Sequence, residues 1–522
     1  MFLISFFLCN FAPNMRYFAS ILLIMYSHLA VSAQDRSIFD SLYYRAEIQA
    51  TLSSGDHTPL WLNANKYGLS SLKTSNGFVR AALQRPLSAD DGRKWGLGYG
   101  VDLVVAAGFT STFVVQQAYV EGRWLKGVLT VGAKEQPMEL KNQELSTGSQ
   151  TLGINARPVP QVRLALPDYW SIPGTRNWLA LKGHIAYGIT TDDKWQQDFA
   201  APYTKRTENT LYHSKAGYLK IGPGRFTAEL GLEMASQFGG RSYREMEGGN
   251  WMWTDNEKGL KAFWHALVPG GSEVGEGMYG NAGGNHLGSW VARLNYEADA
   301  FAISTYVDHF FEDQSAMFQL DYDGYGTGDE WNSKKDSRYL LYDFKDMLLG
   351  AELKLKRFCW LNDIVVEYLY SKYQSGPVYH DRTPAYSDHI GGDDNYYNNY
   401  VYTGWQHWGQ VMGNPLYRSP LYNEDGTIRV ANNRMVAWHL GLSGDPLPTL
   451  HYRLLTTYQT GLGTYDDPFT SPQYNFSLLA ELFWQLRHGW ILRGALGMDQ
   501  GKLLGDNYGA QLSIVKSGIF AK

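Results

Sequence analysis

The sequence predicts an all-β fold, a transmembrane antiparallel β-barrel of about eighteen strands with short periplasmic turns and long extracellular loops. Many segments of about ten residues alternate between apolar and polar side chains, as strands with a lipid face and a lumen face do. The connections between these segments alternate between short and long. The chain is 15% aromatic with a mean hydropathy of −0.33, too polar for a helical membrane protein.

The N-terminus reads as a secretory signal peptide covering residues 1–33. Arg16 gives a positive start, residues 18–29 are mostly apolar, and residues 31–33 are suited to cleavage. A membrane anchor is the weaker alternative, because the apolar run is short. Residues 34–522 are then expected to form one barrel in the outer membrane.

The hairpin at residues 474–499 shows the strand pattern most clearly. Apolar side chains stand at every second position from Tyr474 to Trp484, Glu481 belongs to the intervening set, and residues 487–489 form a tight turn. The other predicted strands are 43–52, 77–87, 95–107, 113–124, 128–134, 161–167, 178–189, 211–221, 226–236, 290–297, 301–311, 348–355, 363–373, 436–443, 450–459 and 508–516.

The connections assign the two ends of the barrel. The long ones are expected outside the cell and are 53–76, 135–160, 190–210, 237–289, 312–347 and 374–435. A soluble sandwich or propeller has no reason to alternate short and long connections in this way. Residues 257–267 carry a helical pattern, which either folds into the lumen or packs within its loop.

Several functions are disfavoured. The net charge is −5 and no basic stripe appears, so nucleic acid is not an expected partner. Cys9 lies in the leader, which leaves Cys359 alone in the mature chain and permits no internal disulfide. No nucleophile elbow, phosphate loop or His-Glu-x-x-His motif is present, so we predict neither enzymatic activity nor a cofactor. Residues 321–330 resemble a calcium loop only in part, since Tyr325 replaces an oxygen ligand, and no metal is predicted.

The longest loop, 374–435, carries a cluster of aromatic side chains among amides and carboxylates. Aromatic faces stack on sugar rings, and amides and carboxylates bind sugar hydroxyls, so the cluster predicts a carbohydrate site. The alternative is that the rings pack on one another over the barrel mouth. Trp251 and Trp253 in the preceding long loop pose the same alternatives. The candidate carbohydrate-binding residues are Tyr396, Tyr397, Tyr400, Tyr402, Trp405 and Trp408.

Polar groups also gather at the outer end of the strand 301–311. His309, Glu312, Asp313 and Ser315 could pin the following loop inward by hydrogen bonds or contact a ligand. The run HFFEDQS at 309–315 resembles a segment of the Wzi-type capsule assembly outer-membrane proteins. Two further stretches agree with the same family, TPLWLNANKYG at 58–68 and MGNPL at 412–416.

The resemblance implies a monomeric eighteen-stranded barrel, closed to free flow, in the outer membrane. It implies a lectin that binds capsular polysaccharide and helps attach or assemble capsule at the surface of a Gram-negative cell. The best-described members carry a periplasmic helical bundle, whereas here only a few residues separate position 33 from the first strand at 43, which is a departure from the family pattern. Two alternatives stay open. One is a transport channel for saccharides or small solutes, because a barrel of this size can enclose an aqueous lumen. The other is a barrel enzyme whose groups converge only in three dimensions.

Overall fold

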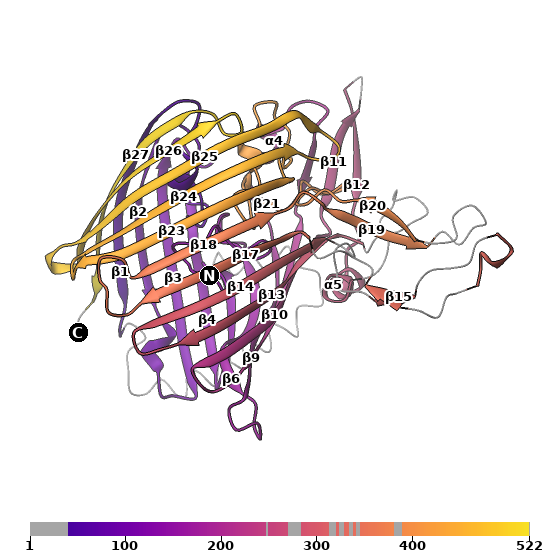
Figure 1. Cartoon of the computed structure of the whole chain (residues 1–522). Helices are drawn as coiled ribbons and strands as arrows, with labels where there is room; N and C mark the ends of the chain where they lie inside the picture. The colour runs from indigo at the N-terminus through magenta and orange to yellow at the C-terminus, as the bar shows by residue number, and fades with distance from the viewer. Residues whose placement is uncertain are drawn as a thin grey trace.

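The structure is a computed structural model that describes residues 40–246, 249–269, 283–312, 320–322, 328–333, 338–340, 345–380 and 389–520. Eighteen strands form one antiparallel sheet (Figure 1). The sheet closes because β1 (Tyr43–Ser54) pairs with both β2 (Ser75–Arg85) and the last strand, β27 (Asn507–Ile519). The predicted leader lies outside the described residues.

Every predicted strand is a strand of this barrel wall. The others are β3 (Trp95–Ala107), β4 (Phe113–Trp124), β5 (Gly127–Ala133), β6 (Gln161–Ser171), β7 (Leu179–Ile189), β9 (Leu211–Ile221), β10 (Phe226–Phe238), β13 (Asn285–Glu297), β14 (Phe301–Glu312), β17 (Met347–Leu355), β18 (Asp363–Tyr370), β23 (Met435–Leu447), β24 (Leu450–Gly463), β25 (Pro468–Gln485) and β26 (Trp490–Gly501). The predicted fold class is therefore confirmed.

The two ends of the barrel differ as predicted. Short turns such as 298–300 and 486–489 join strands at the end where β1 begins and β27 ends, with Tyr43 opposite Ile519. The long loops leave the other end. By the rule for outer-membrane barrels, the turns are periplasmic and the loops extracellular.

The outer wall carries an apolar belt whose side chains project from alternate strand positions. Large aromatic residues mark its periplasmic rim, among them Trp124 at the end of β4 and Trp490 at the start of β26. Such a girdle is typical of the membrane–water interface. No helix in the described part of the chain is long and apolar enough to cross a bilayer.

Three extracellular loops fold back into the lumen, and together we call them the plug: residues 55–74, 134–160 and 394–434. The first loop carries the short helix α3 (Leu60–Asn63), all of whose residues are buried. Its Trp61 donates a hydrogen bond from Nε1 to Thr457 Oγ1 on β24, at 3.0 Å. The main apolar core of the molecule therefore lies inside the barrel.

Described parts of the loops 190–210 and 239–284 form what we call the crown, above the extracellular rim. It contains α4 (Trp195–Phe199) and a small sheet of β8 (Lys205–Glu208), β11 (Arg241–Met246) and β12 (Asn250–Asp255), and β11 and β12 stand clear of the barrel in Figure 1. The helix predicted within 257–267 is present as α5 (Leu260–Leu267). It packs outside the wall, on β9 and β10, so the lumen alternative for this helix is wrong.

Candidate functional site

The lumen face of the wall presents buried carboxylates, and the second plug loop satisfies them. Glu367 on β18 accepts hydrogen bonds from Ser146 Oγ at 2.6 Å and from the backbone N–H of Thr147 at 2.7 Å. Asp308 on β14 pairs with the Lys141 ammonium at 2.6 Å. Because breaking a buried pair leaves an uncompensated charge, these contacts hold the loop in the lumen.

More wall carboxylates repeat this arrangement around the barrel. Glu233 on β10 accepts a bond from Ser149 Oγ at 3.1 Å, and Glu352 on β17 accepts one from Asn142 Nδ2 at 2.8 Å. Residues 134–160 are therefore fastened to several wall strands at once.

The third plug loop rests on the second through backbone carbonyls. Trp405 donates from Nε1 to Thr151 O at 3.0 Å, and Asn414 Nδ2 donates to Gly148 O at 3.0 Å. His407 receives the Thr191 N–H at its Nε2, at 3.0 Å, and burial lowers its pKa to about 4. The second and third plug loops therefore pack on each other as two layers joined by hydrogen bonds.

This packing corrects part of the predicted carbohydrate site. Tyr396, Tyr397, Tyr402 and Trp405 are all buried in the plug. Tyr397, for example, lies with its ring centroid 4.2 Å from that of Tyr417. A ring enclosed on both faces offers no surface to a sugar, so the prediction is wrong for these four. They follow the alternative, in which loop rings pack on one another.

Tyr400 and Trp408 differ from the other four rings. The Tyr400 side chain is 71% exposed, and Lys205 of the neighbouring loop donates to its backbone carbonyl at 3.1 Å. Trp408 is half-buried, with the Arg157 guanidinium 4.2 Å above its ring. Both lie on the extracellular side and remain candidates for sugar contact.

The motif residues at the end of β14 pin the loop in place. His309 contacts Asp346 O through Nδ1 at 2.8 Å, and Glu312 Oε1 accepts the Tyr397 N–H at 2.5 Å. Both side chains are buried. Of the two readings, the structural one fits these two residues. Asp313 and Ser315 lie outside the described residues.

The crown also carries an aromatic surface that was not predicted from the sequence. Register places Arg206 of β8, Tyr243 of β11 and Trp253 of β12 side by side on one face of the small sheet. The Arg206 guanidinium lies 5.0 Å from the centre of the Tyr243 ring, and Trp253 is 58% exposed.

Charged groups lie in the next row of the same face. Arg241 holds Asp255 through two hydrogen bonds of 2.8 and 3.1 Å, which lower the pKa of the Asp255 carboxyl. Tyr243 Oη donates to Glu208 at 2.9 Å. We call the two rows the crown platform: Arg206, Glu208, Arg241, Tyr243, Trp253 and Asp255. Trp253 was a candidate for sugar contact in the sequence analysis. Its neighbours on the platform come from the loops 190–210 and 237–289, which are brought together only by strand pairing.

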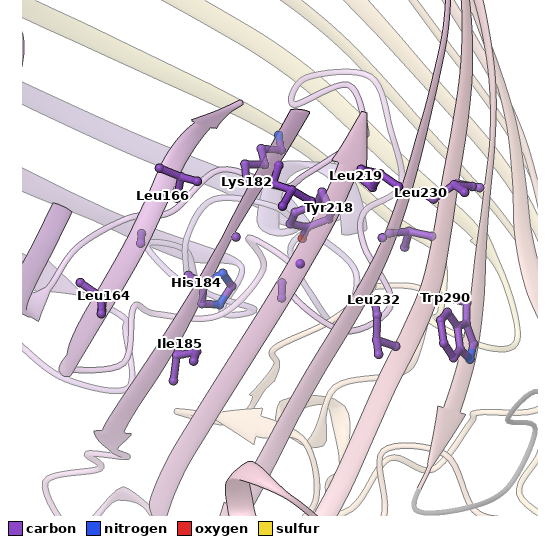
Figure 2. Close-up of a pocket in the computed structure, with 18 of the residues that line it drawn as sticks. Leu164, Leu166, Lys182, His184, Ile185, Tyr218, Leu219, Leu230, Leu232 and Trp290 are labelled. Carbon is purple, nitrogen blue, oxygen red and sulfur yellow. The ribbon is translucent and has the colours of Figure 1, made fainter. Parts of the chain in front are cut away.

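One hollow of the described structure lies in the outer wall. It has a volume of about 1020 Å³ and is lined mainly by outward apolar side chains of strands from β6 to β14 (Figure 2). Gly183 and Gly217 stand opposite each other in its middle, where a side chain is missing from the belt. It faces lipid and is no site for a sugar.

No group of three His, Cys, Asp or Glu side chains among the described residues is placed to hold a metal ion. Half of the calcium-like stretch 321–330, residues 323–327, lies outside those residues.

No family model matches the chain, and no curated protein matches it. Wzi from Escherichia coli, an outer membrane protein involved in group 1 capsule assembly and a carbohydrate-binding β-barrel, superimposes with a TM-score of 0.52 at 13% identity, over 94% of this chain and 86% of Wzi. Two Pseudomonas aeruginosa barrels give a TM-score of 0.44. OccK2, solved with glucuronate, is 9% identical over 92% of this chain and 98% of its own. OprD is 8% identical over 94% of this chain and 98% of OprD. The likeness to Wzi shows the fold, and the protein is an outer-membrane β-barrel.

Proposed function

We propose that this barrel is a monomeric lectin that binds capsular polysaccharide at the cell surface and helps attach or assemble capsule, without catalysis. The observation that carries the proposal is the contrast between the filled lumen and the exposed crown. The lumen is filled by a plug fastened to buried carboxylates, whereas the crown presents exposed aromatic and charged side chains to the outside. The description of Wzi as a carbohydrate-binding barrel supports the same reading.

The crown platform has the chemistry that sugar recognition needs. The C–H face of a pyranose ring stacks on Trp253, while Asp255 and Arg241 hydrogen-bond its hydroxyls. Arg206 and Arg241 also suit a carboxylated sugar, because guanidinium groups bind carboxylates at two points. A repeating polymer contacts many barrels at once, so weak single sites add up to firm retention. Tyr400 and Trp408 extend the aromatic surface on the plug side.

The proposal is tested by replacing Trp253 and Tyr243 together with Ala. Loss of the stacking surface, at roughly 25 cal/mol per Å², should weaken binding by about 1–2 kcal/mol, or about tenfold. Glycan-array binding of the purified protein and capsule shed into the medium are the measurements.

Met252→Ala is the matched control, because Met252 is also exposed but lies on the opposite face of β12. If the double variant binds glycans undiminished while Met252→Ala weakens binding, the platform is not the site. If the intact protein binds no surface polysaccharide, the lectin function itself is rejected.

A further inference from the structure

Helix α5 lies against the outer face of the barrel wall, at the extracellular end. Its Ala262 and Ala266 are buried against the wall, and the Phe263 ring lies 5.2 Å from that of Phe238 on β10. Phe238 is eight residues beyond Leu230, which points outward and is 47% exposed. An even spacing along a strand keeps the same face, so α5 covers outward positions.

The wall holds the helix by its backbone. Tyr187 Oη of β7 donates to Phe263 O at 2.9 Å. Lys215 of β9 reaches up from the apolar belt and donates to Ala266 O at 3.2 Å and to Leu267 O. A lysine at the last carbonyls satisfies acceptors that the helix leaves open and favours its negative end. The position of α5 is therefore built into the wall.

The face of α5 turned away from the wall is apolar. Leu260 is 79% exposed, Trp264 59% and Val268 49%, and their spacing of four residues stacks them along one side. Nothing in the described part of the chain covers them. Exposing such an apolar stripe to water is unfavourable, so we expect an apolar surface or phase to cover this face of α5.

The depth of α5 identifies that partner. The outward apolar positions of β10 run from Phe226 to Met234 and give way to Ser236 just below Phe238. Nine residues of a tilted strand span about 25 Å, the height of the apolar band of an outer-membrane barrel. The helix therefore lies where hydrocarbon meets head groups, and its apolar stripe continues the lipid-facing belt.

We propose that α5 is an interfacial helix that inserts Leu260, Trp264 and Val268 into the outer leaflet and anchors the crown to the lipid surface. A helix in the plane of the membrane buries its apolar face at the boundary of head groups and acyl chains. Lys258 and Lys261 flank this stripe with side chains that are 59% and 75% exposed, and they pair with Asp255 at 3.3 Å and with Glu257 at 3.7 Å. This anchoring is independent of whether the crown binds a glycan.

Depth-dependent quenching tests the proposal. In a Cys359→Ser background, Leu260→Cys and Trp264→Cys are labelled separately with the environment-sensitive dye NBD. The full chain is reconstituted in vesicles of phosphatidylcholine and phosphatidylglycerol that contain lipids with nitroxide groups at the head group or along the acyl chain. We expect both labels to lose about half of their emission or more with shallow nitroxides.

Two further labels calibrate the result. Leu496→Cys, on the lipid belt, should be quenched by deep nitroxides, and Tyr400→Cys, on the extracellular surface, by neither. Quenching is measured only on protein that shows the heat-modifiable gel mobility of a folded barrel. If the Leu260 and Trp264 labels behave like the Tyr400 label, α5 faces water or a protein partner, and the proposal is overturned.

Discussion

At the scale of single residues, His407 joins three loops of the extracellular half. Its Nδ1 lies 2.8 Å from Arg157 O and its Nε2 accepts the Thr191 N–H, an arrangement that needs the neutral ring with hydrogen on Nδ1. Burial lowers the pKa of His407 from 6.5 to about 4. Protonation would remove the acceptor at Nε2 and place a charge inside the plug.

The plug should therefore loosen in acid. Because the pKa of His407 is lower in the fold than in the unfolded chain, the unfolded chain binds the proton first as the pH falls. The stabilising contribution is complete above pH 6.5 and is lost between 6.5 and about 4. It amounts to about 3 kcal/mol at most. Hydrogen exchange at 394–434, corrected for intrinsic rates, should be faster at pH 4.5 than at pH 7.5.

His407→Gln provides the comparison for this effect, since the amide keeps one donor and one acceptor without titrating. The variant should show equal protection at both pH values, apart from changes that it shares with the rest of the chain. Equal protection in the unmodified protein would mean that His407 does not control the plug.

At the scale of the element, strand β26 tests the orientation of the wall. Leu496 lies midway along β26, is 65% exposed and pairs with Ala480 and Ala510. Leu496→Arg should destabilise the barrel by roughly 2–4 kcal/mol, the cost of arginine at the bilayer midplane. Urea titration of the barrel in phospholipid vesicles measures the change.

Tyr508→Arg is the depth control for this substitution. Tyr508 also faces outward but stands at the extracellular end of β27, where the same change should cost about 0–1 kcal/mol. Equal losses at both positions would contradict the assigned depth of the belt.

The strands were predictable because alternation and tight turns are local features of the sequence. Where the pattern fades, the prediction fell short. β25 begins at Pro468, six residues before the predicted 474, because its outer end rises above the membrane and carries prolines and polar residues. Above the bilayer neither face of a strand has to be apolar, so the alternation is lost.

The plug could not be predicted in the same way, because its interior is as polar as a solvated loop. Asn414 and Asn432 are fully buried, yet in sequence they read as surface residues. Their partners lie far along the chain: Asn414 donates to Gly148 O, and Asn432 Oδ1 accepts the Gly463 N–H at the end of β24. The spacing of residues in the sequence does not reveal contacts between such distant residues. For the same reason, the burial of the loop tyrosines could not be predicted.

At the scale of the whole molecule, the plug decides between a binding protein and a channel. An eighteen-stranded barrel is wide enough for an aqueous pore, so closure depends on the loops alone. We expect no steady ion conductance from the unmodified protein in a planar bilayer. Replacing residues 139–156 with a short Gly-Ser linker should open a conducting pore.

Shortening the crown hairpin 241–255 is the control, since its strands β11 and β12 stand outside the lumen and their loss should leave the barrel closed. The opened pore should favour cations, because Glu233, Asp308 and Glu367 would face water without their plug partners. Steady conductance of the unmodified protein would instead support the channel function. The wall carboxylates would then be transport groups that the plug covers in only one of two states.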